Sequence, residues 1–209
     1  MPSQFPYTAY FDRRFNCEAV KLLPGEHLAT AQHKVIIATL GSSVSACLFD
    51  PIAGVGGLTH FLLPSDSHGF WCQSSVHAYA IQTLDTLLGG VKQLGGQHIR
   101  LKVKLFGDAN LLQMSGKISS SWETVTANFV TNYFQSQNIA IINGDLGQTY
   151  ARKIYFFPKT GDVLMKKITR LNNDTIFARE SEYRYQLSLQ LRSSQPTSGD
   201  FKQHNATND

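Results

Sequence analysis

The stretch of residues 35–64 constrains the fold more than any other part of the chain. It holds three apolar runs, which are separated by Gly41-Ser42-Ser43 and by a turn over residues 50–54. Short apolar runs bounded by Gly, Pro and Asp predict β-strands. In the turn, Pro51 presets its own φ angle and Asp50 can bond to its own backbone. We therefore expect the stretch to fold back on itself as antiparallel strands.

This fold-back brings a hydroxyl and an imidazole together. If the turn is tight and centred on Pro51-Ile52, Ser43 lies opposite His60. Opposed residues on one face of an antiparallel pair have Cβ atoms about 5 Å apart. At that spacing a hydroxyl and an imidazole can form a nucleophile and base pair. The nearby glycines, Gly41 and the pair Gly56-Gly57, let the backbone approach a ligand closely.

Five segments occur in an order and at spacings that match one family pattern. They are 23–26 (LPGE), 40–64 (LGSSVSACLFDP, then GVGGLTHFLLP), 106–110 (FGDAN), 144–147 (GDLG) and 152–161 (RKIYF, then TG). Together they resemble the chemoreceptor glutamine deamidases, the CheD family of bacterial chemotaxis. The resemblance covers most of the chain.

The resemblance implies an activity and a set of site residues. Family members hydrolyse the side-chain amide of particular receptor glutamines to glutamate, and some also cleave receptor methyl esters. Their nucleophile is a cysteine at the position of Ser43, and their base is a histidine at the position of His60. A threonine six residues before the nucleophile is the third member. That position is Ile37 here, so we take the nearest threonine, Thr39, as its equivalent. The expected oxyanion and substrate-binding residues are Gly41, Ser42 and Val44.

Serine at position 43 departs from the family pattern. A thiol has a pKa of about 8.5 and ionises easily beside an imidazole. A serine hydroxyl needs a base, an orienting group and an oxyanion hole all in place. We therefore expect this chain to be inactive or severely slowed as a deamidase. Because the residues around Ser43 and His60 keep the pattern, an introduced replacement of cysteine is favoured over a natural non-catalytic relative.

Two other functions stay open from the sequence. The chain can be a genuine serine hydrolase, or a non-catalytic adaptor that binds the receptor or a CheC-type phosphatase. By resemblance, the expected partners are the cytoplasmic helical domain of methyl-accepting chemoreceptors and a CheC-type phosphatase. No cofactor is expected. His60, His68, Cys72 and His77 do not have standard zinc-ligand spacings, so no metal site is expected either.

Composition narrows the class of protein. With 209 residues, 42% hydrophobic and 16% charged, the chain suits one domain with an ordinary core. A net charge of +4 is too small for a nucleic-acid footprint and gives mild attraction to an acidic partner. Three cysteines cannot all be paired within one chain, which favours a reducing cytoplasm. The sequence contains no run of about eighteen apolar residues, so no membrane-spanning segment is predicted.

Periodicity predicts an α+β fold. Helices are expected over 74–94 and after Ser120, among about seven strands that include 98–106, 138–142 and a hairpin of 152–157 with 163–168. Asn143-Gly144 is expected to form a turn. The resemblance refines the fold to a three-layer α/β/β sandwich, similar to the catalytic domain of the cytotoxic necrotizing factor toxins.

We divide the chain into three parts. Residues 1–33 are expected to form a loop-rich segment packed on the domain, and residues 34–170 the CheD-like domain. Residues 171–209 form a C-terminal extension. Its strict alternation over 183–192 predicts an edge strand or a partner-binding strand, followed by a disordered tail.

Overall fold

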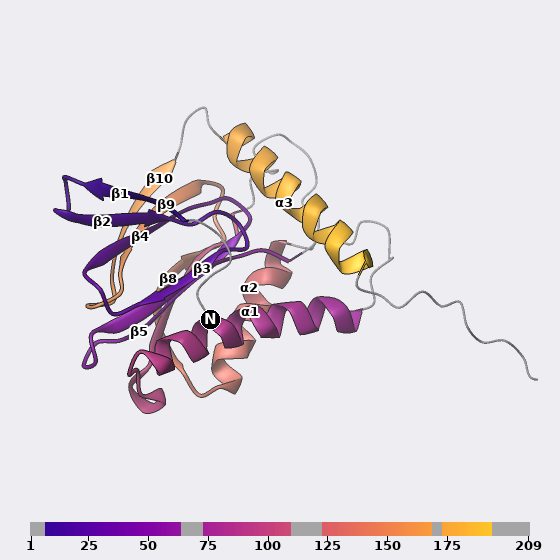
Figure 1. Ribbon diagram of the computed structural model, residues 1–209. Coiled ribbons are helices and arrows are strands. Elements are labelled where there is room, and N and C mark those ends of the chain that lie inside the picture. The colour runs from indigo at the N-terminus through magenta and orange to yellow at the C-terminus, as the bar shows by residue number, and fades with distance from the viewer. Residues whose placement is uncertain (1–6, 64–72, 110–122, 169–172, 194–209) are drawn as a thin grey trace, which may run out of the picture.

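The computed structural model describes residues 7–63, 73–109, 123–168 and 173–193, and these form one α+β domain with two mixed sheets (Figure 1). In the first sheet the strand order is β1 (Thr8–Asp12), β2 (Cys17–Lys21), β4 (Lys34–Leu40), β9 (Ala151–Phe157) and β10 (Asp162–Ile168). In the second sheet it is β3 (His27–Thr30), β6 (Val55–Phe61), β5 (Val44–Asp50), β7 (Lys102–Gly107) and β8 (Ala140–Leu146). The parallel pairs are β2 with β4 and β7 with β8.

Three α-helices lie in the described part of the chain: α1 (Gln73–Gln93), α2 (Glu123–Ser136) and α3 (Asn173–Ser193). A single 3₁₀ turn spans His98–Arg100. None of these helices combines the length and the apolar character needed to cross a bilayer.

The domain has three layers, and a hydrophobic cluster fills each of the two spaces between them. Between α1, α2 and the second sheet lies the larger cluster, which includes Leu84, Leu87, Phe134, Leu48 and Val103. Between the two sheets lies the second cluster, with Ile36, Leu40, Leu58, Ile154 and Phe156. Strand β5 is central in the second sheet and buried along its whole length, because alternate side chains enter the two clusters. The predicted α+β class is confirmed.

Several predicted elements are present with small shifts. The first predicted helix is α1, and the predicted hairpin is β9 with β10, whose innermost pair is Phe157 with Asp162. The expected strand over 98–106 begins later, at Lys102, because a 3₁₀ turn takes up its first residues.

The prediction of a turn at Asn143-Gly144 is wrong. Both residues lie inside β8, which pairs with β7 across an irregularity in the register at Val103/Lys104. A Cβ atom on Gly144 would come 2.1 Å from the carbonyl oxygen of Leu105. Glycine is therefore required there by the close approach of two strands.

Two predictions for the ends of the chain also fail. The N-terminal segment is not loop-rich where the structure describes it, since β1, β2 and β3 lie there and β2 pairs with β4. The edge strand expected over 183–192 is part of helix α3. Burial in α3 follows helical spacing at Ile176, Glu180 and Leu187, whereas Tyr185 and Leu189 are exposed. The expected tail lies outside the described residues.

Candidate functional site

The fold-back of β5 and β6 is confirmed, but its register differs from the prediction by two residues. Asp50 caps a four-residue turn: its Oδ1 accepts the N–H groups of Ile52 and Ala53, and its carbonyl accepts that of Gly54. With this longer turn, Ser45 and not Ser43 is the Cα partner of His60. The tight two-residue turn was the wrong assumption, because Asp50 stabilises a wider one.

Ser43 and His60 nevertheless meet. The Oγ atom of Ser43 lies 2.9 Å from Nε2 of His60, and both side chains are buried. Ser43 precedes β5 by one residue, so the direction of its side chain is not set by the alternation of side chains along the strand. The imidazole comes from β6, on the face that also carries Leu58 toward the other sheet. The predicted juxtaposition is therefore present through a different register.

The segment 22–26 fixes His60 at three points. The ring Nδ1 lies 3.2 Å from the carbonyl oxygen of Leu22. The N–H of Gly25 donates to the His60 carbonyl at 2.7 Å, and the His60 N–H donates to the carbonyl of Glu26 at 2.9 Å. Because a carbonyl can only accept, Nδ1 carries a proton and Nε2 faces Ser43. The orienting group of the imidazole is thus a backbone carbonyl, which the sequence did not indicate.

The segment after β7 holds the backbone of the loop at 41–43. The N–H of Asp108 donates to the carbonyl of Ser43 at 2.9 Å, and that of Ala109 donates to the carbonyl of Gly41 at 2.8 Å. Gly107 has a φ of +123°, and a Cβ atom there would lie 1.9 Å from the Ser43 carbonyl oxygen. Glycine is therefore required where the two segments touch.

An ion pair lies behind this contact. Arg152 in β9 is buried and pairs with Asp145 of β8, and it also donates to the carbonyl of Gly147. The N–H of Gly147 in turn donates to the carbonyl of Gly107 at 3.0 Å. Four of the five segments that carry the family resemblance thus brace the fifth, which holds Ser43 and His60.

Glu180 of α3 fills the space in front of Ser43. Its carboxylate accepts the N–H groups of Gly41, Ser42 and Ser43 at 2.9, 2.9 and 3.2 Å. It also accepts the hydroxyls of Ser42 at 2.7 Å and Ser43 at 2.5 Å. Arg184, one turn further along α3, donates to Oγ of Ser42 at 2.8 Å. Glu180 is only 1% exposed, and sequence reasoning missed it.

The sequence does contain a signal for Glu180. The buried residues Ile176, Glu180 and Leu187 and the half-buried Tyr183 recur at helical spacing, so the acid lies in a stripe that is otherwise apolar or aromatic. An acidic residue on the buried face of a helix needs partners. The stripe was overlooked because the alternation over 183–192 suggested a strand instead.

Glu180 determines the direction in which the hydroxyl proton of Ser43 points. A serine hydroxyl has one proton, and here Ser43 donates it to the carboxylate, so its contact with His60 Nε2 is a hydrogen bond only when Nε2 carries a proton. Burial alone would raise the pKa of Glu180, but the hydrogen bonds from Ser43 and Ser42 outweigh it and lower the pKa. Burial lowers the pKa of His60, although the negative charge of Glu180 acts in the opposite direction. With Glu180 in place, the Ser43 proton points away from the imidazole, which cannot act as its base.

The other predicted residues of the site are Gly41, Ser42, Val44 and Thr39. N–H groups of Gly41 and Ser42 do line the site, but the third N–H that reaches the carboxylate is that of Ser43 and not of Val44. Thr39 is half-buried in β4. It follows Ile37 by two residues, and Ile37 and Val35 face the outer side of the first sheet. By strand alternation Thr39 lies on that outer side, and its role stays a prediction. His68 and Cys72 lie outside the described residues.

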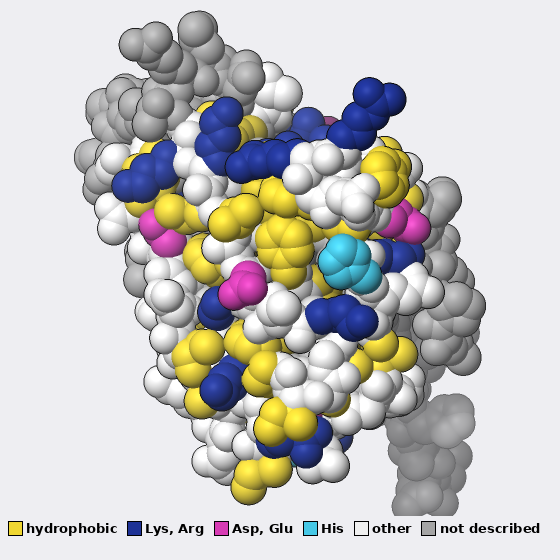
Figure 2. Space-filling view, turned by 90° about the vertical axis from the view of Figure 1, so that its left-hand side faces the viewer, with side chains coloured by type: hydrophobic (Ala, Val, Ile, Leu, Met, Phe, Trp, Pro, Cys, Tyr) yellow, Lys and Arg dark blue, Asp and Glu magenta, His cyan; other side chains and the backbone are white. Residues whose placement is uncertain are grey.

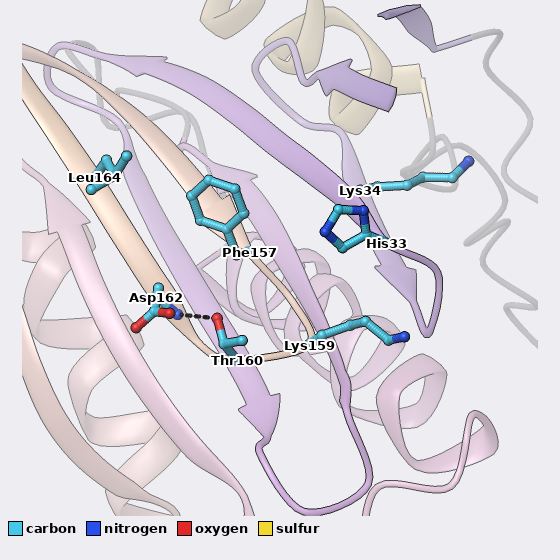
Figure 3. Close-up of a pocket in the computed structure, with 7 residues that line it drawn as sticks. All are labelled: His33, Lys34, Phe157, Lys159, Thr160, Asp162 and Leu164. Carbon is cyan, nitrogen blue, oxygen red and sulfur yellow. Dashed lines mark hydrogen bonds between the residues drawn. The ribbon is translucent and has the colours of Figure 1, made fainter. Parts of the chain in front are cut away.

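A surface pocket elsewhere does not belong to this site. It lies beside the turn between β9 and β10, and its lining residues are His33, Lys34, Phe157, Lys159, Thr160, Asp162 and Leu164 (Figure 3). On the face seen in Figure 2, hydrophobic side chains are interspersed with lysines and arginines. The pocket contains neither Ser43 nor His60.

Comparison with known proteins indicates the same family as the sequence motifs. The family model described as CheD chemotactic sensory transduction matches residues 62–167. A probable chemoreceptor glutamine deamidase CheD of Methylobacillus flagellatus is 39% identical over 184 residues, covering 86% of this chain and 89% of the relative. A probable chemoreceptor glutamine deamidase CheD 1 of Shewanella oneidensis is 41% identical over 179 residues, covering 85% and 86%. The chain therefore belongs to the CheD family.

Proposed function

We propose that the chain is a chemotaxis hydrolase of the CheD type, whose site at positions 43 and 60 is built to hydrolyse glutamine side-chain amides on chemoreceptors. The names of its relatives support this activity class. The observation that carries the proposal is the contact of 2.9 Å between Ser43 Oγ and His60 Nε2, beside N–H groups that already bind a carboxylate. Those N–H groups are donors of the kind that stabilise a developing oxyanion.

The proposed chemistry is acyl transfer through a nucleophile at position 43. With cysteine at position 43, as in the family pattern, a thiolate attacks the carbonyl carbon of the amide, and the carbonyl oxygen becomes an oxyanion held by the N–H groups of residues 41 and 43. Protonated His60 gives its Nε2 proton to the departing nitrogen, which leaves as ammonia. His60 then takes a proton from water, which attacks the thioester and releases glutamate. The thiolate is regenerated in this step.

Serine at position 43 leaves this site short of an ionised nucleophile. A hydroxyl must lose its proton during the attack, and the imidazolium that results needs stabilisation. Here the imidazole is oriented by the neutral carbonyl of Leu22 and not by a carboxylate. This favours an inactive or severely slowed chain over a genuine serine hydrolase, because Glu180 contacts Ser43 and not Nδ1 of His60.

The partner follows from the same argument. We propose the cytoplasmic helical domain of methyl-accepting chemoreceptors as the substrate, which places the protein in the cytoplasm. A CheC-type phosphatase contact, a role as a non-catalytic adaptor, and a likeness to the cytotoxic necrotizing factor catalytic domain remain predictions from the resemblance alone. Thr39 as third member of the site is a prediction of the same kind.

Ammonia release from receptor cytoplasmic fragments tests the proposal. The parent chain, Ser43→Cys, and Ser43→Cys with Glu180→Ala are compared, because the Glu180 carboxylate occupies the N–H groups in the parent. We expect release only when sulfur is present, and loss of that release when His60→Ala is added. Release by the parent chain would favour the serine hydrolase. No release from any variant, with fold intact, would favour the adaptor.

A further inference from the structure

One buried charge has no part in the proposed chemistry. The carboxylate of Glu180 accepts three N–H groups and two hydroxyls, all of them from residues 41–43. A carboxylate taken out of water is costly unless such donors are ready for it. The donors at 41–43 are therefore preorganised for an anionic or carbonyl group at the end of a side chain.

The identity of this occupant is informative. The Oε1 atom of Glu180 lies within hydrogen-bond distance of the Gly41 and Ser43 N–H groups and of Ser43 Oγ. In the proposed reaction, one oxygen of the product glutamate lies in this position. Glu180 has the same side chain as that product. A helix of the chain thus presents a glutamate to its own site.

We propose that α3 closes the site by placing Glu180 as a product-like occupant, so that a substrate must displace α3 before it can react. This inference rests on the proposed function for its product analogy. The closure itself follows from the geometry, since Glu180 contacts both the N–H groups and the hydroxyl at position 43. No second side chain can use the same donors while α3 is docked.

Contacts on either side of Glu180 hold α3 in place. Ile176 and Leu187 are buried one turn before Glu180 and two turns after it. The hydroxyl of Tyr183 lies 2.7 Å from that of Tyr79 in α1, and its ring packs directly on Gly25. Figure 1 shows α3 running from the side of β10 toward α1, across one end of the sheets. α3 is therefore docked through one face, which carries Ile176, Glu180, Tyr183 and Leu187.

Docking within one chain makes the closure effective and reversible. A tethered segment competes with free ligands at an effective concentration that is on the order of millimolar for short linkers. The opposite face of α3 is exposed at Tyr185 and Leu189. Release of α3 as a unit costs only the contacts of its docked face, and such local opening is less costly than global unfolding.

The accessibility of a thiol at position 43 tests the closure. The background is the full chain with Ser43→Cys, and site-resolved mass spectrometry follows alkylation at this position separately from the natural cysteines. Leu187→Asp undocks α3 while keeping the carboxylate, and Leu189→Asp is its control on the exposed face of the same helix. We expect Leu187→Asp to raise the alkylation rate at least about tenfold and Leu189→Asp to leave it unchanged. Equal rates in the background and both variants would overturn the closure.

Glu180→Ala provides a second variant in case Leu187→Asp fails to fold, with Glu182→Ala as its control at an exposed glutamate of α3. Hydrogen exchange in β5 and β6 reports whether the domain is intact in each variant. We expect Glu180→Ala to raise alkylation and Glu182→Ala not to. If neither Glu180→Ala nor Leu187→Asp changes the rate in a folded domain, α3 does not cover position 43.

The product-like pose has a sharper test. In a chain with Ser43→Cys and Glu180→Gln, the side-chain amide at position 180 lies where the substrate amide would lie. Hydrolysis converts it to the acid and releases ammonia, with water as the co-reactant. We expect the peptide containing position 180 to gain the mass of that conversion. Glu182→Gln in the same background, and Glu180→Gln with His60→Ala added, should not convert.

The outcomes separate the two proposals. Conversion at position 180 supports both the pose and the activity. No conversion, in a chain that does release ammonia from receptor fragments, overturns the pose and leaves the activity standing. Protection of the thiol without hydrolysis of any amide supports the closure and contradicts the proposed activity.

Discussion

The Oγ atom of Ser43 donates a hydrogen bond to Oε1 of Glu180 at 2.5 Å, although the two residues are 137 positions apart in the sequence. This contact joins the C-terminal helix to the loop that precedes β5. It also explains why the hydroxyl at position 43 is not poised for attack, although an imidazole nitrogen lies 2.9 Å away. The state described by the structure is therefore a closed one.

The docking of α3 should depend on pH. The pKa of Glu180 is lowered from its ordinary value of 4.5 in the docked state, chiefly by Ser43 and Ser42 acting against burial. Its contribution is thus fully present above that value and is lost as pH falls through the lowered pKa. Burial lowers the pKa of His60 from 6.5, but the negative charge of Glu180, which lies beside the imidazole when α3 is docked, acts in the opposite direction.

Hydrogen exchange of α3, corrected for the intrinsic effect of pH, measures this dependence. We expect protection to fall as the solution is acidified below about pH 4.5. In Glu180→Gln the same acidification should have a smaller effect, because the group no longer titrates. Protection that falls equally in both chains would show that another group controls docking.

Gly25 should be intolerant of a side chain for two reasons. Its φ is +85°, and a Cβ atom would lie 2.1 Å from the Tyr183 hydroxyl. Gly95 shares the first feature, with a φ of +103°, but has open space around it. Gly95→Ala should therefore cost about 1 kcal/mol through backbone strain, and Gly25→Ala about 1 to 3 kcal/mol more. Urea unfolding of the two variants measures the difference.

Hydrogen exchange of α3 adds a local measurement. Gly25→Ala should loosen α3 and Gly95→Ala should not, because only Gly25 contacts Tyr183. Equal free energies of unfolding and equal protection of α3 in the two variants would mean that the contact between Gly25 and Tyr183 contributes nothing.

The turn that sets the register of β5 and β6 depends on Asp50. It is buried, pairs with Arg100 at 2.8 Å, and accepts the N–H groups of Ile52, Ala53 and Gln97. Burial would raise the pKa of Asp50, but Arg100 and these N–H groups hold it well below the ordinary value of 3.8. Asp50→Asn should therefore cost about 2 to 4 kcal/mol at neutral pH.

This cost should vanish in acid. The ionised carboxylate contributes fully above the ordinary value of 3.8, and its contribution is lost as pH falls through the lowered pKa. The gap between the parent and Asp50→Asn in urea unfolding should therefore narrow as the pH falls below that value. Asp162→Asn, at an exposed position, should show almost no gap at any pH. A gap for Asp50→Asn that stays constant into acid would contradict the argument.

The sequence predicted the strand pair around position 43 for reasons that are local. Apolar runs and the Asp50 turn act over a few residues, and burial on both faces makes β5 continuous. Its register was missed because hydrogen bonds to Asp50 widen the turn. Ser43 and His60 still meet, since the residue before a strand is free of the strand's alternation.

The elements that the sequence did not predict depend on distant partners. Helix α3 shows alternation over ten residues, and only contacts with Gly25 and Ser42 reveal which of its faces is buried. The carbonyl of Leu22 has no side-chain signature at all, because any residue supplies one. Glu180 could be suspected from its place among Ile176, Tyr183 and Leu187, but its target lies far away in the sequence.

The pH dependence of alkylation at position 43, in a chain with Ser43→Cys and Glu180→Ala, tests the central claim that this position and His60 form one acyl-transfer pair. With His60 present, the thiol should titrate below about 8.5, because the imidazolium stabilises the thiolate. With His60→Ala added, the midpoint should move to the ordinary range or above it, since the site is buried. The same midpoint in both chains would contradict the pairing of the two residues.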